Sequence, residues 1–459
     1  MQARELIRAM AAIDFESIPP LVREKARVHI RDAIGVGMAA AADSVGRPYR
    51  TYAENVARPG SSTLLCNGNV GDAADAALIN GGLVHSIEFD DTHTPSIVHG
   101  SAVTMPAALA LAEERGLPGR ELIRLYILGY EALIRIGLSG PGSFQARGFQ
   151  VTSVGGALVA AAMAATAGGL DEDAAVHAVG VALSMASGSM EFLSNGSTVK
   201  SMNPGWAAHA GVCAARLAEA GLTGPETSME GRFGLTAMYA GGEHSTPVDF
   251  TTLGREWRLP EVAIKFQPAC HYLHAFIECA SQIRKAGIDP SEIERLKCLV
   301  PAGAAGVVCE PWQTKLAPET GHAMRWSLPG VLASELVSGV GLKTFETAPG
   351  ADVLDVARKM EWAPFEATAF PARYDAVIDV CHSDGWTKRF SVGDAYGNAS
   401  RPASRPDIEA KFLTNAGALI GSERAPILLD MLDALDGCPD VRELMRDFRR
   451  IAFANELFS

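Results

Sequence analysis

The chain has 459 residues, of which 48% are hydrophobic and 20% are charged, and its formal net charge at pH 7 is −13. This composition is ordinary for a globular protein, and the length exceeds what a single core usually holds, so we expect two domains. No run of lysine and arginine stands out, which makes nucleic acid and membrane surfaces poor candidate partners.

Residues 1–262 predict one helix after another, and therefore an all-helical domain. A proline pair at positions 19 and 20 opens a long helix, because proline is favoured in the first turn. Gly116, Gly169 and Gly221, each followed by leucine, indicate helix ends. The uncharged run 148–170 is long enough to span a membrane, but its alanine and glycine favour a helix buried among others. Further helices are expected at 72–85, 102–114, 120–138, 155–167, 171–186 and 206–220.

The pattern changes near Val262, and residues 263–396 predict a smaller α+β domain. Strands are expected at 293–300, 374–380 and 385–392, with a hairpin turn at 383–385 and helices at 327–338 and 352–359. Helical patterns return in 397–459, at 407–416, 426–435 and 441–449, and we expect these helices to pack back on the first domain. The predicted class is mainly α, with a large all-helical domain and a smaller α+β domain.

Cysteine usage and the first residues both indicate a cytoplasmic protein. The eight cysteines form no CxxC pair and have no zinc or iron–sulfur spacing, which is typical of reduced thiols. The first eight residues, Met-Gln-Ala-Arg-Glu-Leu-Ile-Arg, have mixed charge and no long apolar core, so we expect no signal peptide.

The segment 85–99 concentrates titratable groups between two nearly charge-free segments. It reads His85-Ser-Ile-Glu-Phe-Asp-Asp-Thr-His-Thr-Pro-Ser-Ile-Val-His99 and holds three histidines, one glutamate and two aspartates. Such groups are costly to desolvate unless they are paired. Their position at the junction of two apolar segments indicates a site that handles protons, carboxylates or a metal ion.

Four blocks of the sequence, in order, resemble the MmgE/PrpD family. They are the segment 85–99; Lys200-Ser-Met-Asn-Pro-Gly-Trp-Ala-Ala-His-Ala-Gly211; Lys265-Phe-Gln-Pro-Ala-Cys-His-Tyr-Leu-His274; and Tyr396-Gly-Asn398 with Arg401-Pro402 and 408–412. No single block is decisive, but four in register are specific. The resemblance implies a large helical domain, a smaller α+β lid, a homodimer, and a site between the domains that needs no metal or organic cofactor.

The chemistry shared by the family is removal of a proton beside a carboxylate of the substrate. Such a C–H is a very weak acid, so the carboxylates must be held by cations while a base lies near the carbon. By the resemblance, His99 would be the base or the acid that returns the proton. The structural alternative is a histidine that caps the helix starting near Ser101. Lys200 and Lys265 would bind the carboxylates of a di- or tricarboxylic acid, a task that suits a compact positive charge.

The remaining catalytic candidates have structural alternatives. By the resemblance, Glu88 and Thr92 would contact the substrate, and with Asp91 they would orient the base or a departing hydroxyl group. Asp90 and Asp91 are equally compatible with a helix cap or a turn. On a helix starting near Pro268, His274 would share a face with Cys270 and could return a proton, whereas His271 would lie one position off that face. A core histidine bonded to a backbone carbonyl is the structural alternative for His274.

Two positions depart from the family pattern. Gln150 stands where the family usually has a histidine, and glutamine can hydrogen-bond but cannot exchange protons near neutral pH. Gly330 stands where the family has a tyrosine, with Arg325 nearby. We take Gln150 and Arg325 as candidate substrate-binding residues. The loss of a histidine and a tyrosine argues against decarboxylation of cis-aconitate and favours a substrate of different shape.

We therefore expect a lyase of the 2-methylcitrate dehydratase type, which removes a proton next to a carboxylate and eliminates water. The alternative within the family is an epimerase, isomerase or decarboxylase acting on a related polycarboxylate. A carboxylate-binding protein without turnover and a thiol nucleophile at Cys270 beside His274 are further possibilities. A metal-dependent hydrolase is the alternative from another class of enzyme. Its metal ligands would be His85, Glu88, Asp90, Asp91, His93 and His99, although their spacing fits no known metal motif.

Overall fold

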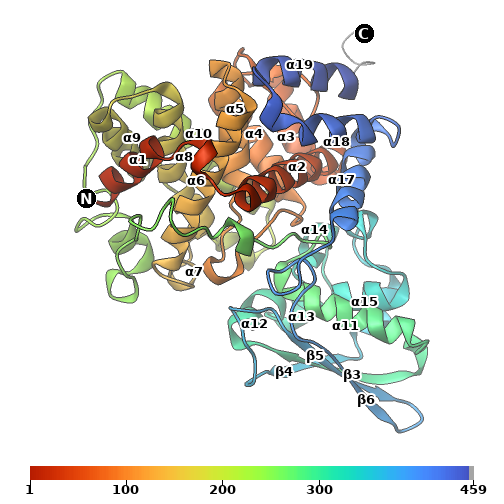
Figure 1. Ribbon diagram of the computed structural model, residues 1–459. Helices are drawn as coiled ribbons and strands as arrows, with labels where there is room; N and C mark the ends of the chain where they lie inside the picture. Colours follow the sequence, from red (N-terminus) through yellow and green to blue (C-terminus); the bar gives the residue numbers. More distant parts are fainter. Residues whose placement is uncertain (454–459) are drawn as a thin grey trace.

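A computed structural model describes residues 1–453, which form two hydrophobic cores. The larger core draws its side chains from 3–262 and again from 412–453, and the smaller one from 269–395. The smaller core belongs to the α+β unit at the lower right of Figure 1. The expected class, mainly α with a smaller α+β domain, is confirmed. The large domain is not entirely helical, because β1 (Ser62–Thr63) and β2 (Val70–Gly71) form a two-stranded antiparallel sheet in it.

The helices expected in the first part of the chain are present, with ends shifted by a few residues. Three other helices had not been expected: α1 (Gln2–Ala12), α3 (Arg47–Asn55) and the short α7 (Ser143–Ala146). The expected helices are α2 (Pro20–Ala42), α4 (Ala73–Ser86), α5 (Ser101–Arg115), α6 (Gly119–Leu138), α8 (Val151–Gly168), α9 (Glu172–Met185) and α10 (Met202–Glu219).

The expected helix ends have the geometry of glycine stops. Gly116, Gly169 and Gly221 have φ of 66°, 67° and 95°, a region that glycine adopts without steric cost. The leucine after each glycine donates its N–H to a carbonyl of the preceding helix, and these three bonds are 2.9–3.1 Å long. The glycine–leucine pairs therefore close α5, α8 and the last turn after α10.

Helix α8 is the part of the described chain that is long and apolar enough to cross a membrane, by length and composition alone. In the structure it packs against α5, α6, α9 and α10, and 83% of its apolar window is buried. The expectation of a buried core helix agrees with this environment.

Helix α10 lies against α4 at a distance that only glycine permits. A Cβ atom on Gly205 would lie 2.3 Å from the carbonyl oxygen of Leu78, and one on Gly81 would lie 2.6 Å from the Cα of Gly205. Separations this short would force the two backbones apart. The close approach brings Lys200, just before α10, next to the loop that follows α4.

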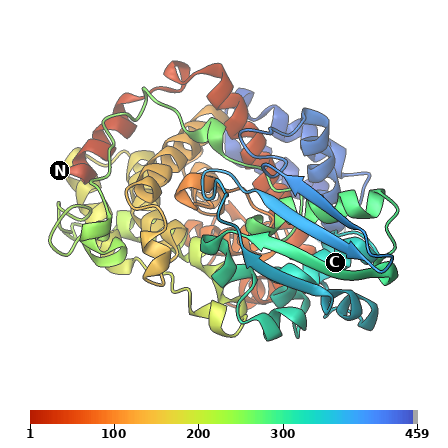
Figure 2. The same cartoon turned by 90° about the horizontal axis from the view of Figure 1, so that it is seen from below.

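The smaller domain is built on a four-stranded sheet in the order β4-β3-β5-β6. The expected strands are β3 (Ile293–Val300), β5 (Ala376–His382) and β6 (Thr387–Val392), and β5 and β6 form the expected hairpin. Strand β4 (Met360–Pro364) was not expected; it pairs parallel to β3 at an edge. Helix α11 (His274–Lys285) packs on β5 and β6, and it also contacts α15 (Leu328–Val337). Figure 2, a view from below, shows the sheet on the side nearest the viewer.

The other helices of the smaller domain are short and lie between β3 and β4. Of these, α16 corresponds to the helix expected at 352–359. They are α12 (Ala302–Val308), α13 (Trp312–Leu316), α14 (Gly321–Met324) and α16 (Ala351–Ala357).

The start of α11 corrects the expectation of a helix beginning near Pro268. The chain is extended at Cys270, whose N–H donates to the carbonyl of Arg325 at 2.9 Å, and residues 271–273 form a single 3₁₀ turn. A backbone held in this way cannot start a helix before His274. Cys270 and His274 therefore do not share a helix face.

The last helices return to the large domain, as Figure 1 shows in blue. They are α17 (Arg405–Ile420), α18 (Ala425–Asp433) and α19 (Val441–Ala452). Helix α17 packs along α2, and α19 packs on α5. Lys411 of α17 donates to Asp32 of α2 at 2.9 Å, and both side chains are buried. This ion pair joins segments far apart in the sequence.

Candidate active site

The loop between α4 and α5 is buried, and its backbone has an unusual shape. Glu88 and Ile97 have φ of 54° and 55°, which side chains with a Cβ rarely adopt. Thr92 exchanges two backbone hydrogen bonds with Ala263, at 3.1 and 2.9 Å. The loop is therefore attached to the segment that leads into the smaller domain.

Three buried cations bind three consecutive carbonyl groups of this loop. Arg325 Nη1 donates to Ile87 O at 2.7 Å, Lys265 Nζ donates to Glu88 O at 3.1 Å, and Lys411 Nζ donates to Phe89 O at 3.0 Å. We call Arg325, Lys265 and Lys411 the three-cation cap. The three residues come from separate parts of the sequence. Charge-assisted bonds of this kind are stronger than neutral ones and can hold a strained backbone.

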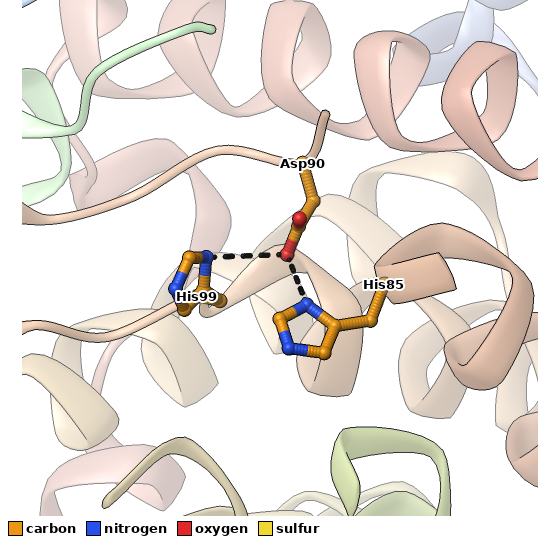
Figure 3. Close-up of side chains that lie close together, drawn as sticks. All are labelled: His85, Asp90 and His99. Atoms are coloured by element: carbon orange, nitrogen blue, oxygen red, sulfur yellow. Dashed lines mark hydrogen bonds and ion pairs between the residues drawn. The ribbon is translucent and has the colours of Figure 1, made fainter. Parts of the chain in front are cut away.

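Asp90 lies between His85 and His99 and interacts with both (Figure 3). One of its oxygens lies 2.7 Å from Nδ1 of His85 and 3.3 Å from Nδ1 of His99. Gln150 fixes the other nitrogen of His85 at 3.0 Å, and Gln150 itself accepts a bond from Asn203. Nε2 of His99 has no hydrogen-bond partner within residues 1–453, so His99 is the member of this group with a free ring nitrogen.

The environment favours an ionised Asp90 and a neutral His99. Burial opposes ionisation of Asp90, but His85 and His99 hold its pKa well below the usual value. Burial lowers the pKa of His99, and Asp90 offsets this effect only in part. Because Asp90 binds Nδ1, the proton of the neutral ring sits there and Nε2 carries the lone pair. His99 is thus a base near neutral pH.

Glu88 is the anionic partner of two lysines. Lys200 forms a direct ion pair with its carboxylate, and Lys265 Nζ lies 3.7 Å from the other oxygen. Burial of Glu88 would raise its pKa, but the two ammonium groups together hold it well below the usual value. Lys200 also lies 5.1 Å from the centre of the Trp326 ring. Its ammonium group has three N–H bonds, so it can bind a further acceptor while it holds Glu88.

A pocket of about 540 Å³ lies between the two domains, above these groups. From the large domain it is lined by Glu88, Thr92, His99, Gln150 and Lys200. From the smaller domain it is lined by Cys270, His271, Tyr272, Trp326, Phe370 and Tyr374. Five of the residues singled out in the sequence therefore meet at one cavity.

The other four sequence candidates lie outside the pocket lining. Lys265 is fully buried behind Glu88, and Arg325 belongs to the three-cation cap. Asp91 accepts bonds from Ser101 and Tyr130, which agrees with its structural alternative. His274 lies behind the pocket wall and donates Nε2–H to the carbonyl of Ala269 at 3.3 Å. Burial lowers the pKa of His274 to about 3, with a further contribution from Lys265.

Two residues of the site were not selected from the sequence. Asp90 was treated as a turn residue or metal ligand, and only the loop geometry shows that it orients His99. His271 was set aside as one position off a helix face, but no helix exists there and the residue lines the pocket. Its two ring nitrogens make no hydrogen bond with the described residues, and burial lowers its pKa well below the usual value.

The thiol of Cys270 lines the pocket but is poorly suited to nucleophilic attack. Burial raises its pKa, and the charge of Glu88 adds to this effect. The thiolate is the reactive form, so a raised pKa makes this cysteine inert near neutral pH.

His85, Asp90 and His99 are also the one group within residues 1–453 whose geometry could hold a metal ion. Their ligand atoms lie within 4.8 Å of one another. However, both Nδ1 atoms already bind the same Asp90 oxygen, and a metal ion at about 2.0–2.2 Å from each ligand would have to replace both hydrogen bonds. His93 points elsewhere, toward Ser96 and Glu261.

Most of the chain matches two family models. Residues 4–247 match the model described as MmgE/PrpD N-terminal domain, and residues 267–436 match the MmgE/PrpD C-terminal domain. Cis-aconitate decarboxylase of Mus musculus is 27% identical over 93% of this chain and 88% of its own length. The enzyme of Aspergillus terreus is 24% identical over 94% and 92%. Cis-aconitate decarboxylase-like protein oryM of Aspergillus oryzae is 26% identical over 81% of each chain.

Proposed function

The chain belongs to the MmgE/PrpD family, and from this premise we propose that it is a cofactor-independent lyase of the dehydratase type. Its substrate is a carboxylic acid with a hydroxyl group on the carbon next to the one that loses a proton. The curated relatives that match the chain include cis-aconitate decarboxylases, which are lyases, and they support the class of reaction rather than this particular one.

The observation that carries the proposal is the neutral His99, oriented by Asp90, at the wall of a pocket that also contains Lys200. A base whose pKa is close to the working pH is the most effective proton acceptor. The carboxylate on Nδ1 fixes the tautomer and stabilises the imidazolium that forms when Nε2 takes a proton. The structural alternative, a histidine capping α5, is not favoured, because the Nε2 atom lacks a partner within the described residues.

Lys200 is the residue that we assign to the substrate carboxylate. It lines the pocket, whereas Lys265 is enclosed and binds the backbone and carboxylate of Glu88. A cation bound to the carboxylate stabilises the negative charge that develops when the neighbouring C–H bond breaks. Lys265 then acts as a positioning residue that keeps Glu88 and Lys200 in place.

In this elimination His99 alone can carry out both proton transfers. Nε2 of His99 takes the proton from the carbon beside the carboxylate, and the C–H electrons form the double bond. The C–O bond on the next carbon breaks, and the departing hydroxide takes the proton from His99 and leaves as water. Thr92, whose hydroxyl lies 3.3 Å from Nδ1 of His99, is placed to hydrogen-bond the oxygen that departs.

The test is a proton-exchange screen by NMR in D₂O over small polycarboxylic and hydroxy acids. We expect exchange at a carbon next to a carboxylate, and an alkene product where a hydroxyl group is present. His99→Ala and Lys200→Ala should each lower the rate by about 10²–10⁴-fold. The exposed residues His244 and Lys285 provide matched controls, since alanine at either should leave the rate unchanged. An unchanged rate in both His99→Ala and Lys200→Ala would contradict the proposal.

Epimerisation is the second candidate, and the placement of His271 favours it. A two-base epimerase needs a neutral base on each side of the carbon, and His99 and His271 come from the two domains that enclose the pocket. Exchange into a substrate that lacks a hydroxyl group, without alkene or carbon dioxide, would identify this reaction. His271→Asn should then abolish epimerisation while leaving exchange by His99 on one face.

The metal-dependent alternative has its own test. Elemental analysis of the purified protein after dialysis against a chelator should give much less than one equivalent of zinc, manganese or iron, with the exchange rate retained. If the purified protein instead holds one equivalent of metal, and the chelator removes both the metal and the activity, His85, Asp90 and His99 would be favoured as a metal site.

A further inference from the structure

The pocket above His99 is large and mostly apolar away from its polar end. Its volume of about 540 Å³ is in the range of pockets that take drug-sized ligands, about 300–1,000 Å³. Its apolar lining includes Met190, Phe192, Leu193, Val307, Trp326 and Phe370. A six-carbon acid held by Lys200 would leave much of this apolar lining uncovered.

The charge of the lining argues in the same direction. Lys200 is the one lysine among the lining residues, which include no arginine, and the Glu88 carboxylate beside it is shared with the enclosed Lys265. A tricarboxylate would bring three negative charges to this wall. Buried carboxylates without cationic partners are costly, so the pocket matches one or two carboxylates and no more.

The apolar part of the pocket is formed by aromatic rings that pack against one another. Tyr272, Phe370 and Tyr374 form a cluster whose ring centres are 5.1–5.3 Å apart, which fixes the orientation of Phe370. Trp326 lies over the ammonium group of Lys200, so the aromatic surface begins where the carboxylate would bind. The polar and apolar parts therefore adjoin each other, as they would around an amphipathic ligand.

We propose that the substrate is a mono- or dicarboxylic acid with an alkyl or aromatic substituent that lies on the apolar lining of Phe192, Trp326 and Phe370. This inference rests on the proposed function for the reacting end of the substrate, and it adds the chemical class of the remaining part. The carboxylate binds Lys200, and the substituent extends from the reacting carbon toward the smaller domain.

The test measures binding of inert acids by titration calorimetry, without turnover. The series is succinate, methylsuccinate, butylsuccinate, octylsuccinate and benzylsuccinate, with cis-aconitate for comparison. Affinity should rise about four-fold for each added methylene until the pocket is full, which corresponds to about 0.8 kcal/mol per buried CH₂. Cis-aconitate should bind more weakly than butylsuccinate. A flat series, or tightest binding of cis-aconitate, would overturn the inference.

Variants separate the two ends of the ligand. Phe370→Ala and Phe192→Ala should each reduce the gain per methylene by at least half, measured as the ratio of octylsuccinate affinity to succinate affinity in the same variant. Lys200→Ala should weaken every acid in the series by a similar factor. Phe233→Ala, at a side chain that is 67% exposed, is the control and should leave the series unchanged. The series with the unmodified protein decides the question on its own if a variant does not fold.

The same ligands distinguish failure of this inference from failure of the proposed function. A steep series without proton exchange at any acid would leave the inference standing and remove the dehydratase proposal. Proton exchange at small acids together with a flat affinity series would support the proposed reaction and contradict the inference that the substrate carries an apolar substituent.

Discussion

At the scale of single residues, Gln150 holds the ring of His85 in place, whereas the ring of His99 keeps one nitrogen available. Both nitrogens of His85 are bonded, to Asp90 and to Gln150, so its ring cannot turn. His99 is held at Nδ1 alone. A glutamine at position 150 therefore does not remove the base from the site, but gives His85 a fixed partner that does not titrate.

The first prediction concerns Asp90. We expect Asp90→Asn to lower kcat by about 10²–10⁴-fold with little change in KM, because the amide no longer fixes the tautomer of His99 or stabilises its charged form. The rate of proton exchange in D₂O measures the effect. Asp384→Asn, at an exposed side chain, is the control. An unchanged kcat in Asp90→Asn would mean that another group orients the base.

The second prediction concerns pH. The base must be unprotonated, so kcat/KM should be constant near neutral pH and fall as the pH is lowered through the pKa of His99, which burial keeps below its ordinary value near 6.5. The acidic limb should have a slope of one. In Asp90→Asn the limb should move to lower pH, since Asp90 raises this pKa. A limb above pH 7 would contradict a buried, neutral His99.

The sequence located this site better than it assigned roles within it. The concentration of titratable residues marked the segment 85–99, and the resemblance to the MmgE/PrpD family selected Glu88, His99 and Lys200, which the structure brings to one pocket. Asp91 was predicted to orient the base, but Asp90 is the residue that bonds His99. Neighbouring side chains in an irregular loop point in different directions, and residue type alone does not choose between them. That direction depends on the three-cation cap and on φ of Glu88, neither of which follows from a residue pattern.

At the scale of elements, the contact between α4 and α10 places the cation beside the base. Gly81 and Gly205 let the two backbones touch, and the end of α4 carries His85 while the start of α10 follows Lys200. The site therefore depends on a helix pair whose spacing is set by two residues without side chains.

The third prediction tests that spacing. Gly205→Ala should lower the free energy of unfolding by about 1–3 kcal/mol, because its methyl group would meet the carbonyl of Leu78. Urea denaturation measures the change, and activity should fall as well, since the shift moves Lys200. Gly437→Ala, where a Cβ meets nothing within 4 Å, is the control. A stability equal to that of the control would show that the helices separate without cost.

Elements with local signals were predicted well, and those defined by tertiary contacts were not. The caps at Asp72 and Asp171, each accepting a backbone N–H in the first turn, are readable in the sequence. Strand β4 is a short edge strand that ends at Pro364, so it shows little alternation. The extended chain before α11 is fixed by the backbone of Arg325, which lies far away in the sequence.

At the scale of the whole molecule, the three-cation cap connects the separate parts of the chain to one loop. Arg325 lies in the smaller domain, Lys265 near the start of that domain, and Lys411 in the returning helix α17. We propose domain limits at residues 262/263 and 396/397, which agree with the composition of the two cores. The sequence indicated the return of the last helices by their pattern alone, but not that one of them reaches the site.

The fourth prediction concerns the ion pair between Lys411 and Asp32. Burial raises the pKa of Asp32 and lowers that of Lys411, so removing one partner leaves the other poorly compensated. Lys411→Met should cost about 3–5 kcal/mol of unfolding free energy. The double variant with Asp32→Asn should lose less than the sum of the single variants, as measured in a double-mutant cycle by urea denaturation. Strict additivity would falsify the coupling.

The reach of the three-cation cap along the chain also determines when the protein can begin to work. During synthesis α4 and α5 leave the ribosome early, but the carbonyl of Phe89 has no cation until position 411 has emerged and α17 has settled on α2. A growing polypeptide can therefore contain folded helices while the candidate site is still incomplete. Turnover in a translation mixture should therefore appear only after the residues of α17 have been synthesised and have packed on α2.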